Sequence, residues 1–277
     1  MNSVTTPPSL DAVLEAAVRR YDGASPLTAQ IGHHFGYGGT EPPGELLRMR
    51  LVLAVAEEER ADPADVLDVA CAVEVLHQSS LVHDDIEDGD PVRHGRATVW
   101  SRFGLAHGIN AGDALCAIAY LQLLDRGASR PADVTVLMTH RLQEANYAMC
   151  AGLASDIAFE RAADVSLDEY LAMVDGKTSA LFGAACELGA LAAGAEPERA
   201  RAYARLGRTY GLAFQIDDDV RSARKWTYPA IARRCGAPPP AVATRAYLAQ
   251  ADAIAAHSGI DRAGSVRGFF GRHIPQA

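Results

Sequence analysis

Residues 79–100 of this chain read SSLVHDDIEDGDPVRHGRATVW, and this stretch decides the prediction of the fold. Five of its acids fall within seven consecutive residues, namely Asp84, Asp85, Glu87, Asp88 and Asp90. If residues 64–88 form one helix, Asp84 and Asp88 lie one turn apart on the same face. Like charges at that spacing repel each other. We therefore expect this helix end either to be solvated or to hold a cation.

A second acidic cluster, Asp217-Asp218-Asp219, follows the apolar segment GLAFQI near the end of another predicted helix. Two such clusters favour carboxylates that face each other across a cavity. Mg²⁺ suits this arrangement because it binds one or two carboxylates and completes its octahedron with water and substrate phosphates. The pair therefore predicts a metal–diphosphate site, and the alternative is two unrelated solvated helix ends.

Composition favours a single all-α domain over residues 1–277. Apolar residues make up 49% of the 277 residues and aromatic residues only 6%, which suits helices better than strands. We expect helices over residues 10–21, 45–60, 64–88, 110–124, 131–161, 167–175, 177–192, 197–222, 239–257 and 262–273. We expect no strand, a loop over 33–44 and a helix break at Gly176.

Charge and cysteine pattern exclude several classes of protein. A net charge of −9 argues against a nucleic-acid binder, which would carry a basic face. No uncharged apolar run reaches the roughly 20 residues of a membrane helix, so an integral membrane protein is not expected. The five cysteines are scattered singly, and the first residues lack the features of a signal peptide. Both observations predict a cytoplasmic protein with reduced thiols.

From about Gly44 to Pro229 the chain resembles the trans-isoprenyl diphosphate synthase (polyprenyl synthetase) family. Its motifs occur in the family's order, as VEVLHQSSLVHDDIED, RHG, GKTSALF, GLAFQIDDD and KWTYP. The first aspartate-rich motif, DDxxD, is complete as Asp84, Asp85 and Asp88. The resemblance implies an isoprenoid synthase helical bundle around a central cavity. It also implies a homodimer, with a heteromeric partner as the alternative.

The same resemblance implies a prenyltransferase in which three Mg²⁺ ions bind together with the diphosphate of an allylic prenyl substrate. Metal binding is implied for Asp84, Asp85, Asp88, Asp218 and Asp219. Catalytic roles are implied for Asp84, Asp85, Asp88, Arg93, Lys177 and Asp218. Substrate binding is expected for Arg48, His77, Ser79, Ser80, Arg93, His94, Lys177, Thr178, Phe214, Gln215 and Lys225.

Several positions depart from the family's pattern. Glu45 replaces the lysine of the family's GGKxxRP segment, although Arg48 is retained. His94 replaces the second of two arginines that follow the first motif. Ser222 replaces the last aspartate of the second motif, and the long loop that normally follows is absent. These departures predict an intact site for the allylic substrate and a weakened site for isopentenyl diphosphate.

The main hypothesis is therefore a Mg²⁺-dependent prenyltransferase that couples its allylic substrate to a non-standard acceptor. Because Ser79 and Ser80 are small, the hydrocarbon pocket is expected to admit a chain of about C15 to C20. Three alternatives stay open. They are a terpene cyclase on the same scaffold, an ordinary farnesyl or geranylgeranyl diphosphate synthase that uses isopentenyl diphosphate, and a regulatory subunit of a heteromeric synthase.

Overall fold

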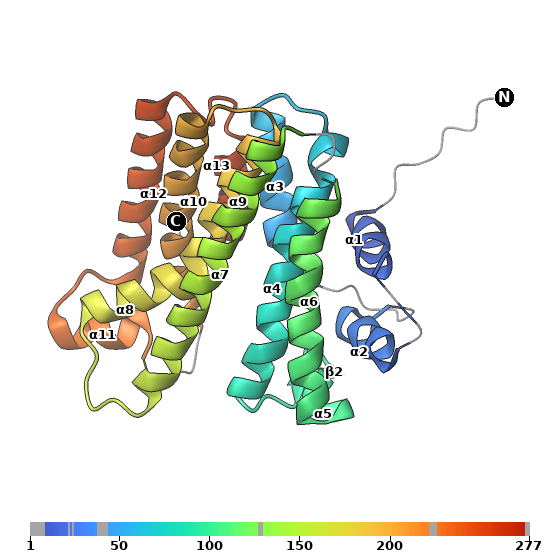
Figure 1. Cartoon of the computed structure of the whole chain (residues 1–277). Helices are drawn as coiled ribbons and strands as arrows, with labels where there is room; N and C mark the ends of the chain where they lie inside the picture. The colour runs from blue at the N-terminus through green and yellow to red at the C-terminus, as the bar shows by residue number, and fades with distance from the viewer. Residues whose placement is uncertain are drawn as a thin grey trace.

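The computed structural model describes residues 9–21, 23, 25–37, 44–126, 130–221 and 226–274, and most of them are helical (Figure 1). The first part contains α1 (Leu10–Arg19), α2 (Pro26–Phe35), α3 (Leu47–Glu58), the 3-10 turn η1 (Pro63–Val66), α4 (Leu67–Glu87), α5 (Val99–Phe103) and α6 (Leu105–Arg126). The second part contains α7 (Ala132–Glu160), α8 (Leu167–Val174), the π-helix η3 (Asp175–Ser179), α9 (Ala180–Ala192), α10 (Pro197–Asp218), α11 (Tyr228–Cys235), α12 (Pro240–Ser258) and α13 (Ser265–His273).

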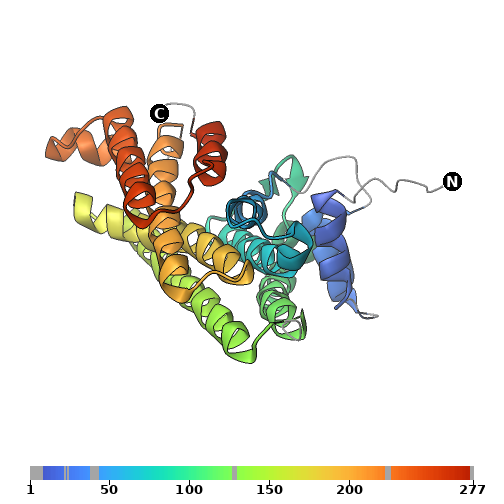
Figure 2. The ribbon, with the colours of Figure 1, turned by 90° about the horizontal axis from the view of Figure 1, so that it is seen from above.

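The long helices run side by side and bury a shared apolar core (Figure 1). Helix α4 packs on α6, whereas α9 packs on α3, α7 and α10, and α10 also contacts α12. The view from above places α1 and α2 on one side of the bundle and α12 on the other (Figure 2). A smaller apolar cluster joins α8, α11 and the end of α10. The predicted all-α fold is confirmed.

Several helix boundaries follow from local sequence signals. The capping box of Ser166 and Glu169 is present at the start of α8, as predicted. Helix α7 is continuous from Ala132 to Glu160, which confirms the long unbroken helix. Asp62 caps η1 at Ala64 N, so the helix that delivers the first acidic cluster begins as a 3-10 turn.

Several sequence-based expectations about elements were wrong, and the short helix α5 was among the elements not predicted. Helices α2 and α11 were not predicted, because Gly and Pro residues near both segments resemble loop signals. Gly176 does not break the helix but lies within η3. Gly176 is present because α7 packs closely against η3. A Cβ added to Gly152 would lie 2.2 Å from the backbone N of Lys177, and one added to Gly176 would lie 2.7 Å from Ala148 O. Two glycines therefore allow α7 and η3 to touch at the backbone.

A short hairpin follows α4, although no strand was expected. Strand β1 (Val92–Arg93) pairs antiparallel with β2 (Arg96–Ala97). The two residues between them, His94 and Gly95, have φ values of 49° and 75°. Positive φ at both positions is typical of the type I′ turn that joins two-residue hairpins. The turn holds Arg93 and Arg96 on adjacent strands.

No helix within the described ranges is both long and apolar enough to cross a membrane. All five cysteines are free thiols, in agreement with the prediction.

Candidate active site

Two adjoining cavities open near the ends of α4 and α10. The aspartate cavity, of about 290 Å³, is lined by Asp84, Asp156, Lys177, Asp218, Asp219 and neighbouring side chains. The arginine cavity, of about 760 Å³, is lined by Arg48, Arg93, Arg96, four histidines and their neighbours. Arg48, His77, Leu81 and Asp218 line both. A ligand in one cavity would therefore lie beside a ligand in the other.

Helix α4 distributes the first acidic motif between these cavities. Asp84 lines the aspartate cavity and Asp85, which is buried, lines the arginine cavity, because successive helical residues point about 100° apart. Asp88 is the C-cap of α4 and its backbone N–H donates to Asp84 O. It lines neither cavity, so the structure brings two of the three predicted acids to cavity walls and leaves Asp88 at the helix end.

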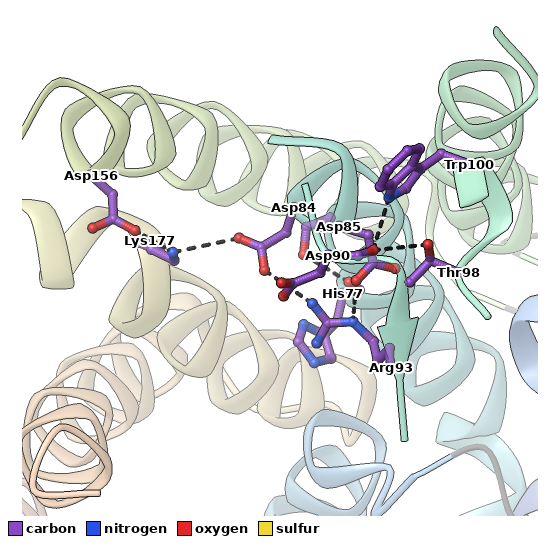
Figure 3. A network of polar contacts seen from close by, with 10 residues as sticks. His77, Asp84, Asp85, Asp90, Arg93, Thr98, Trp100, Asp156 and Lys177 are labelled. Atoms are coloured by element: carbon purple, nitrogen blue, oxygen red, sulfur yellow. Dashed lines mark hydrogen bonds and ion pairs between the residues drawn. The ribbon is translucent and has the colours of Figure 1, made fainter. Parts of the chain in front are cut away.

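Asp84 lies between two cations (Figure 3). Its Oδ1 is 3.5 Å from Lys177 Nζ, and its Oδ2 is 3.2 Å from an Nη of Arg93. Lys177 Nζ also contacts Asp156 at 2.5 Å, and Arg93 Nε contacts Asp85 at 2.5 Å. Burial raises the pKa of Asp85, and the Arg93 guanidinium opposes that shift. Three carboxylates and two cations leave this network with excess negative charge, which suits an added metal ion.

The π-helix η3 presents Lys177 and Thr178 to the aspartate cavity, and π-helical segments are frequent at functional sites. Thr178 Oγ1 donates to Gln215 Oε1 at 2.8 Å, and Gln215 Nε2 donates to Asp219 Oδ1 at 2.8 Å. This chain of hydrogen bonds fixes the orientation of the Gln215 amide. Phe214 lines the arginine cavity instead.

The three aspartates at the end of α10 have different surroundings. Asp217 is buried and lies 3.2 Å from Arg221. Asp219 accepts hydrogen bonds at both oxygens, because the Tyr170 hydroxyl and the Tyr228 N–H share Oδ2 at 2.5 and 2.8 Å while Gln215 bonds Oδ1. These bonds make Asp219 an anchor for α8 and α11, while it also lines the aspartate cavity. Its metal-binding role stays a prediction.

Asp218 is the one aspartate of this triplet that lines both cavities. Its side chain is 53% exposed and lies 3.3 Å from Arg221. It therefore remains accessible to a ligand from either cavity, unlike its neighbours on both sides.

Among the described residues, no three His, Cys, Asp or Glu side chains gather closely enough to hold a metal ion by themselves. Asp84 and Asp218 nevertheless reach the same cavity from α4 and α10. Mg²⁺ is commonly bound by one or two carboxylates plus substrate phosphates. The residues present therefore fit Mg²⁺ that arrives together with a diphosphate.

The arginine cavity is more cationic than the sequence predicted. Arg48, Arg93 and Arg96 line it, and the two departures, Glu45 and His94, are exposed at its edge. Sequence reasoning assigned no role to Arg96, although it directly follows the RHG motif. The weakened second-substrate site stays a prediction, and the three arginines of this cavity argue against it.

Two histidines of this cavity are neutral at physiological pH. Burial lowers the pKa of His34 to about 4, and burial together with Arg48 and Arg93 holds the pKa of His77 well below its usual value. His34 Nε2 bonds Gln78 Oε1 at 2.9 Å, and Gln78 in turn donates to the buried Glu74. His34 was missed because it falls in a segment interpreted as a loop.

The two adjacent serines do not share a role. Ser80 lines the aspartate cavity together with the apolar Met149, Leu153 and Leu181. Ser79 is 4% exposed and lines neither cavity, so its predicted contact with substrate is corrected. Lys225 and Ser222 lie outside the described residues.

The all-α bundle, with its two acidic helix ends beside adjoining cavities, has the isoprenoid synthase fold of the solved structures given below. The sequence signature described as polyprenyl synthetase matches residues 33–227. The chain belongs to the polyprenyl synthetase family.

Curated relatives include two enzymes of Mycobacterium tuberculosis. The chain is 39% identical over 201 residues to a geranylgeranyl diphosphate synthase, covering 70% of this chain and 57% of that one. It is 43% identical over 177 residues to a (2E,6E)-farnesyl diphosphate synthase, covering 64% and 48%. The chain thus spans about half the length of the curated relatives it matches.

Solved structures agree over almost the whole chain. A geranylgeranyl pyrophosphate synthetase from the archaeon Geoglobus acetivorans has a TM-score of 0.83 at 26% identity, covering 96% of this chain and 97% of that one. A polyprenyl synthetase from Streptomyces coelicolor has a TM-score of 0.74 at 30% identity, covering 96% and 88%.

Proposed function

We propose that the chain is a short-chain isoprenyl diphosphate synthase that extends an allylic prenyl diphosphate with isopentenyl diphosphate. The observation that supports this most directly is the pair of adjoining cavities, one acidic with Lys177 and one lined by three arginines. Two diphosphates need two separate sets of cations. The names of the relatives agree with this alternative and give no support to a non-standard acceptor.

The aspartate cavity is the proposed site of the allylic diphosphate. Asp84 and Asp218 would hold Mg²⁺ there, and the bound metal would withdraw charge from the leaving diphosphate. Lys177 and Arg93 now contact carboxylates. On substrate binding they would turn to phosphate oxygens and stabilise the negative charge that develops as the C–O bond breaks. Three Mg²⁺ ions, as in the family, are part of this proposal.

The arginine cavity is the proposed site of isopentenyl diphosphate, with Arg48 and Arg96 binding its phosphates. The alkene carbon of isopentenyl diphosphate would form a bond with C1 of the allylic group. The C1–O bond breaks, diphosphate leaves, and a proton is lost from the new chain. Neutral His77 lies in the wall between the cavities, where an added positive charge would oppose an allylic cation.

The apolar side chains beside Ser80 are the proposed hydrocarbon pocket. Met149 and Leu153 on α7 and Leu181 on α9 line this part of the aspartate cavity. The small side chain of Ser80 leaves room along α4, so we infer a product of about C15 to C20.

We further propose a homodimer formed through α6 and α7. Their exposed apolar side chains include Leu105, Ile109, Leu124, Val136 and Tyr147, which is 76% exposed. Burial of such a face is favourable, at about 25 cal/mol per Å². Light scattering of the purified chain would give the dimer mass, and a monomer at micromolar concentration would contradict the proposal.

The function is tested by incubating the protein with Mg²⁺, isopentenyl diphosphate and C5, C10 or C15 allylic diphosphate, followed by mass spectrometry. We expect diphosphates that are longer by whole C5 units, and no product when Mg²⁺ is chelated. Hydrocarbons formed without isopentenyl diphosphate would identify a cyclase instead. Turnover only with another acceptor, or no turnover with any substrate, would contradict the proposal in favour of the unusual transferase or the regulatory subunit.

A further inference from the structure

Arg48 is a cation that forms no salt bridge with the described part of the chain. It lines both cavities near the start of α3. Its Nε is buried and has no hydrogen-bond partner among the described residues. Burial lowers the pKa of Arg48 to about 10, partly opposed by Glu74, so the guanidinium stays charged at neutral pH. Burial of a charge is costly unless a neighbouring group stabilises it.

Glu74 attracts Arg48 electrostatically, but its two oxygens accept hydrogen bonds from Met49 N–H and the Gln78 amide. The direct contact is with Phe182 of α9. The Cζ atom of Arg48 lies 4.6 Å from the centroid of the Phe182 ring. This separation is within the range of a cation–π interaction, which strengthens when the pair is removed from water.

Phe182 cannot turn away from Arg48 easily. It is fully buried, and its ring contacts Phe214 and Phe270 with centroids 5.3 and 5.5 Å away. Phe270 of α13 in turn stacks on Tyr210 of α10 at 4.3 Å with an interplanar angle of 12°. The ring beneath Arg48 is therefore fixed by aromatic contacts that reach the last helix of the chain.

We propose that Phe182 is a positioning residue for Arg48. It holds the guanidinium in the wall between the cavities without neutralising it, so that all its donors except the buried Nε remain available to a diphosphate in the arginine cavity. An acidic partner would hold Arg48 equally well but would cancel the charge that the substrate requires. The role matters more here because Glu45 stands where the family has a lysine.

This inference rests on the proposed function, since it takes isopentenyl diphosphate as the ligand of the arginine cavity. The test measures binding of isopentenyl diphosphate by calorimetry in the absence of Mg²⁺, and the KM for each substrate where turnover is present. The variants are Phe182→Leu, the milder Phe182→Met, Phe182→Tyr, Arg48→Gln and the double variant Phe182→Leu/Arg48→Gln. Phe269→Leu is the matched control, because that buried ring contacts Phe270 and His273 rather than Phe182.

We expect Phe182→Leu to weaken the binding of isopentenyl diphosphate by about tenfold. The KM for isopentenyl diphosphate should rise by a similar factor. The KM for the allylic substrate and kcat should stay within about twofold. Phe182→Tyr, which keeps the ring, should bind nearly normally. The double variant should bind no more weakly than Arg48→Gln, because the two residues act as one unit.

Normal binding by folded Phe182→Leu, or an equal loss in Phe269→Leu, would overturn the positioning role. If Phe182→Leu does not fold, Phe182→Met decides the matter by the same criteria. Normal binding by Arg48→Gln would instead show that the arginine cavity is not the isopentenyl diphosphate site, which is a failure of the proposed function.

Discussion

The aspartate cavity and the arginine cavity share a wall but hold their charges in opposite ways. In the first, Lys177 is already paired with Asp84 and Asp156, so a ligand must exchange these contacts for its own. In the second, Arg48 rests on an aromatic ring and two half-buried histidines are neutral. Arg93, which also lines the second cavity, is paired with Asp84 and Asp85. Lys177 must leave its ion pairs when a ligand binds the first cavity, whereas Arg48 of the second cavity is already held in place by a ring, which lowers the cost of binding.

The largest effect is expected for a substitution that impairs the aspartate cavity and leaves ligand binding in the arginine cavity intact. Asp84→Asn removes a proposed Mg²⁺ ligand and the carboxylate between Lys177 and Arg93, so kcat should fall by at least about 100-fold. Isopentenyl diphosphate should still bind the arginine cavity within about twofold of the parent. Single-turnover rates and calorimetry check the two halves. An equal loss in both would show that the cavities are not independent.

The free energy of unfolding, measured over a series of pH values, tests whether His34 of the arginine cavity is neutral in the folded protein. The pKa of His34 is about 4 in the folded chain but about 6.5 when unfolded, so the unfolded state takes up a proton first as the pH falls. The free energy of unfolding should therefore decrease between about pH 6.5 and pH 4, by up to about 3 kcal/mol, and be unaffected by His34 above that window.

Urea unfolding of the parent and of His34→Gln, near pH 7 and near pH 5, measures this contribution. The variant should lose less stability than the parent on acidification. Identical losses would mean that His34 is protonated in the folded protein and that the arginine cavity contains a further cation.

Asp218 and Asp219 give a comparison within the aspartate cavity. Asp219→Asn should lower the free energy of unfolding by about 1–3 kcal/mol, because an amide cannot accept at both positions now bonded by Tyr170, Tyr228 and Gln215. Asp218→Asn should leave stability nearly unchanged and lower kcat instead. Thermal melts and steady-state kinetics distinguish the two. Equal melting temperatures would remove the assignment of Asp219 as an anchor.

The smallest effect concerns the two departures at the edge of the arginine cavity. Glu45→Lys combined with His94→Arg should lower the KM for isopentenyl diphosphate only severalfold, roughly three- to tenfold, because both side chains are exposed and screened by water. High salt should reduce the gain. Glu57→Lys, an exposed acid on α3 that lines neither cavity, is the control. A larger gain would mean that the cavity is less preorganised than the structure indicates.

Much of this architecture could be predicted because its signals are local. The capping box at Ser166, the uninterrupted α7 and the two acidic helix ends all follow from the amino-acid sequence. The family motifs also identified Arg48, Lys177, Thr178 and Gln215 as residues that line cavities.

The remaining features depend on tertiary packing. Asp218 and Asp219 are chemically identical neighbours that both line the aspartate cavity, and only the rotation of α10 against α8 decides which one also reaches the arginine cavity. Ser79 and Ser80 differ in the same way on α4. Arg96 and His34 were missed as lining residues of the arginine cavity for a related reason. They reach it from a hairpin and from a helix that were not predicted from local sequence.

The backbone contact between α7 and η3 has a consequence for the engineering of this protein. Gly152 and Gly176 have no side chain that could act on a substrate. A single methyl group on Gly152 would nevertheless displace the segment that positions Lys177. A saturation library screened for activity should therefore rank these two positions with Asp84 among the least tolerant sites. Variation intended to change product length is better confined to Met149 and Leu153, which border the same cavity on α7 without supporting its frame.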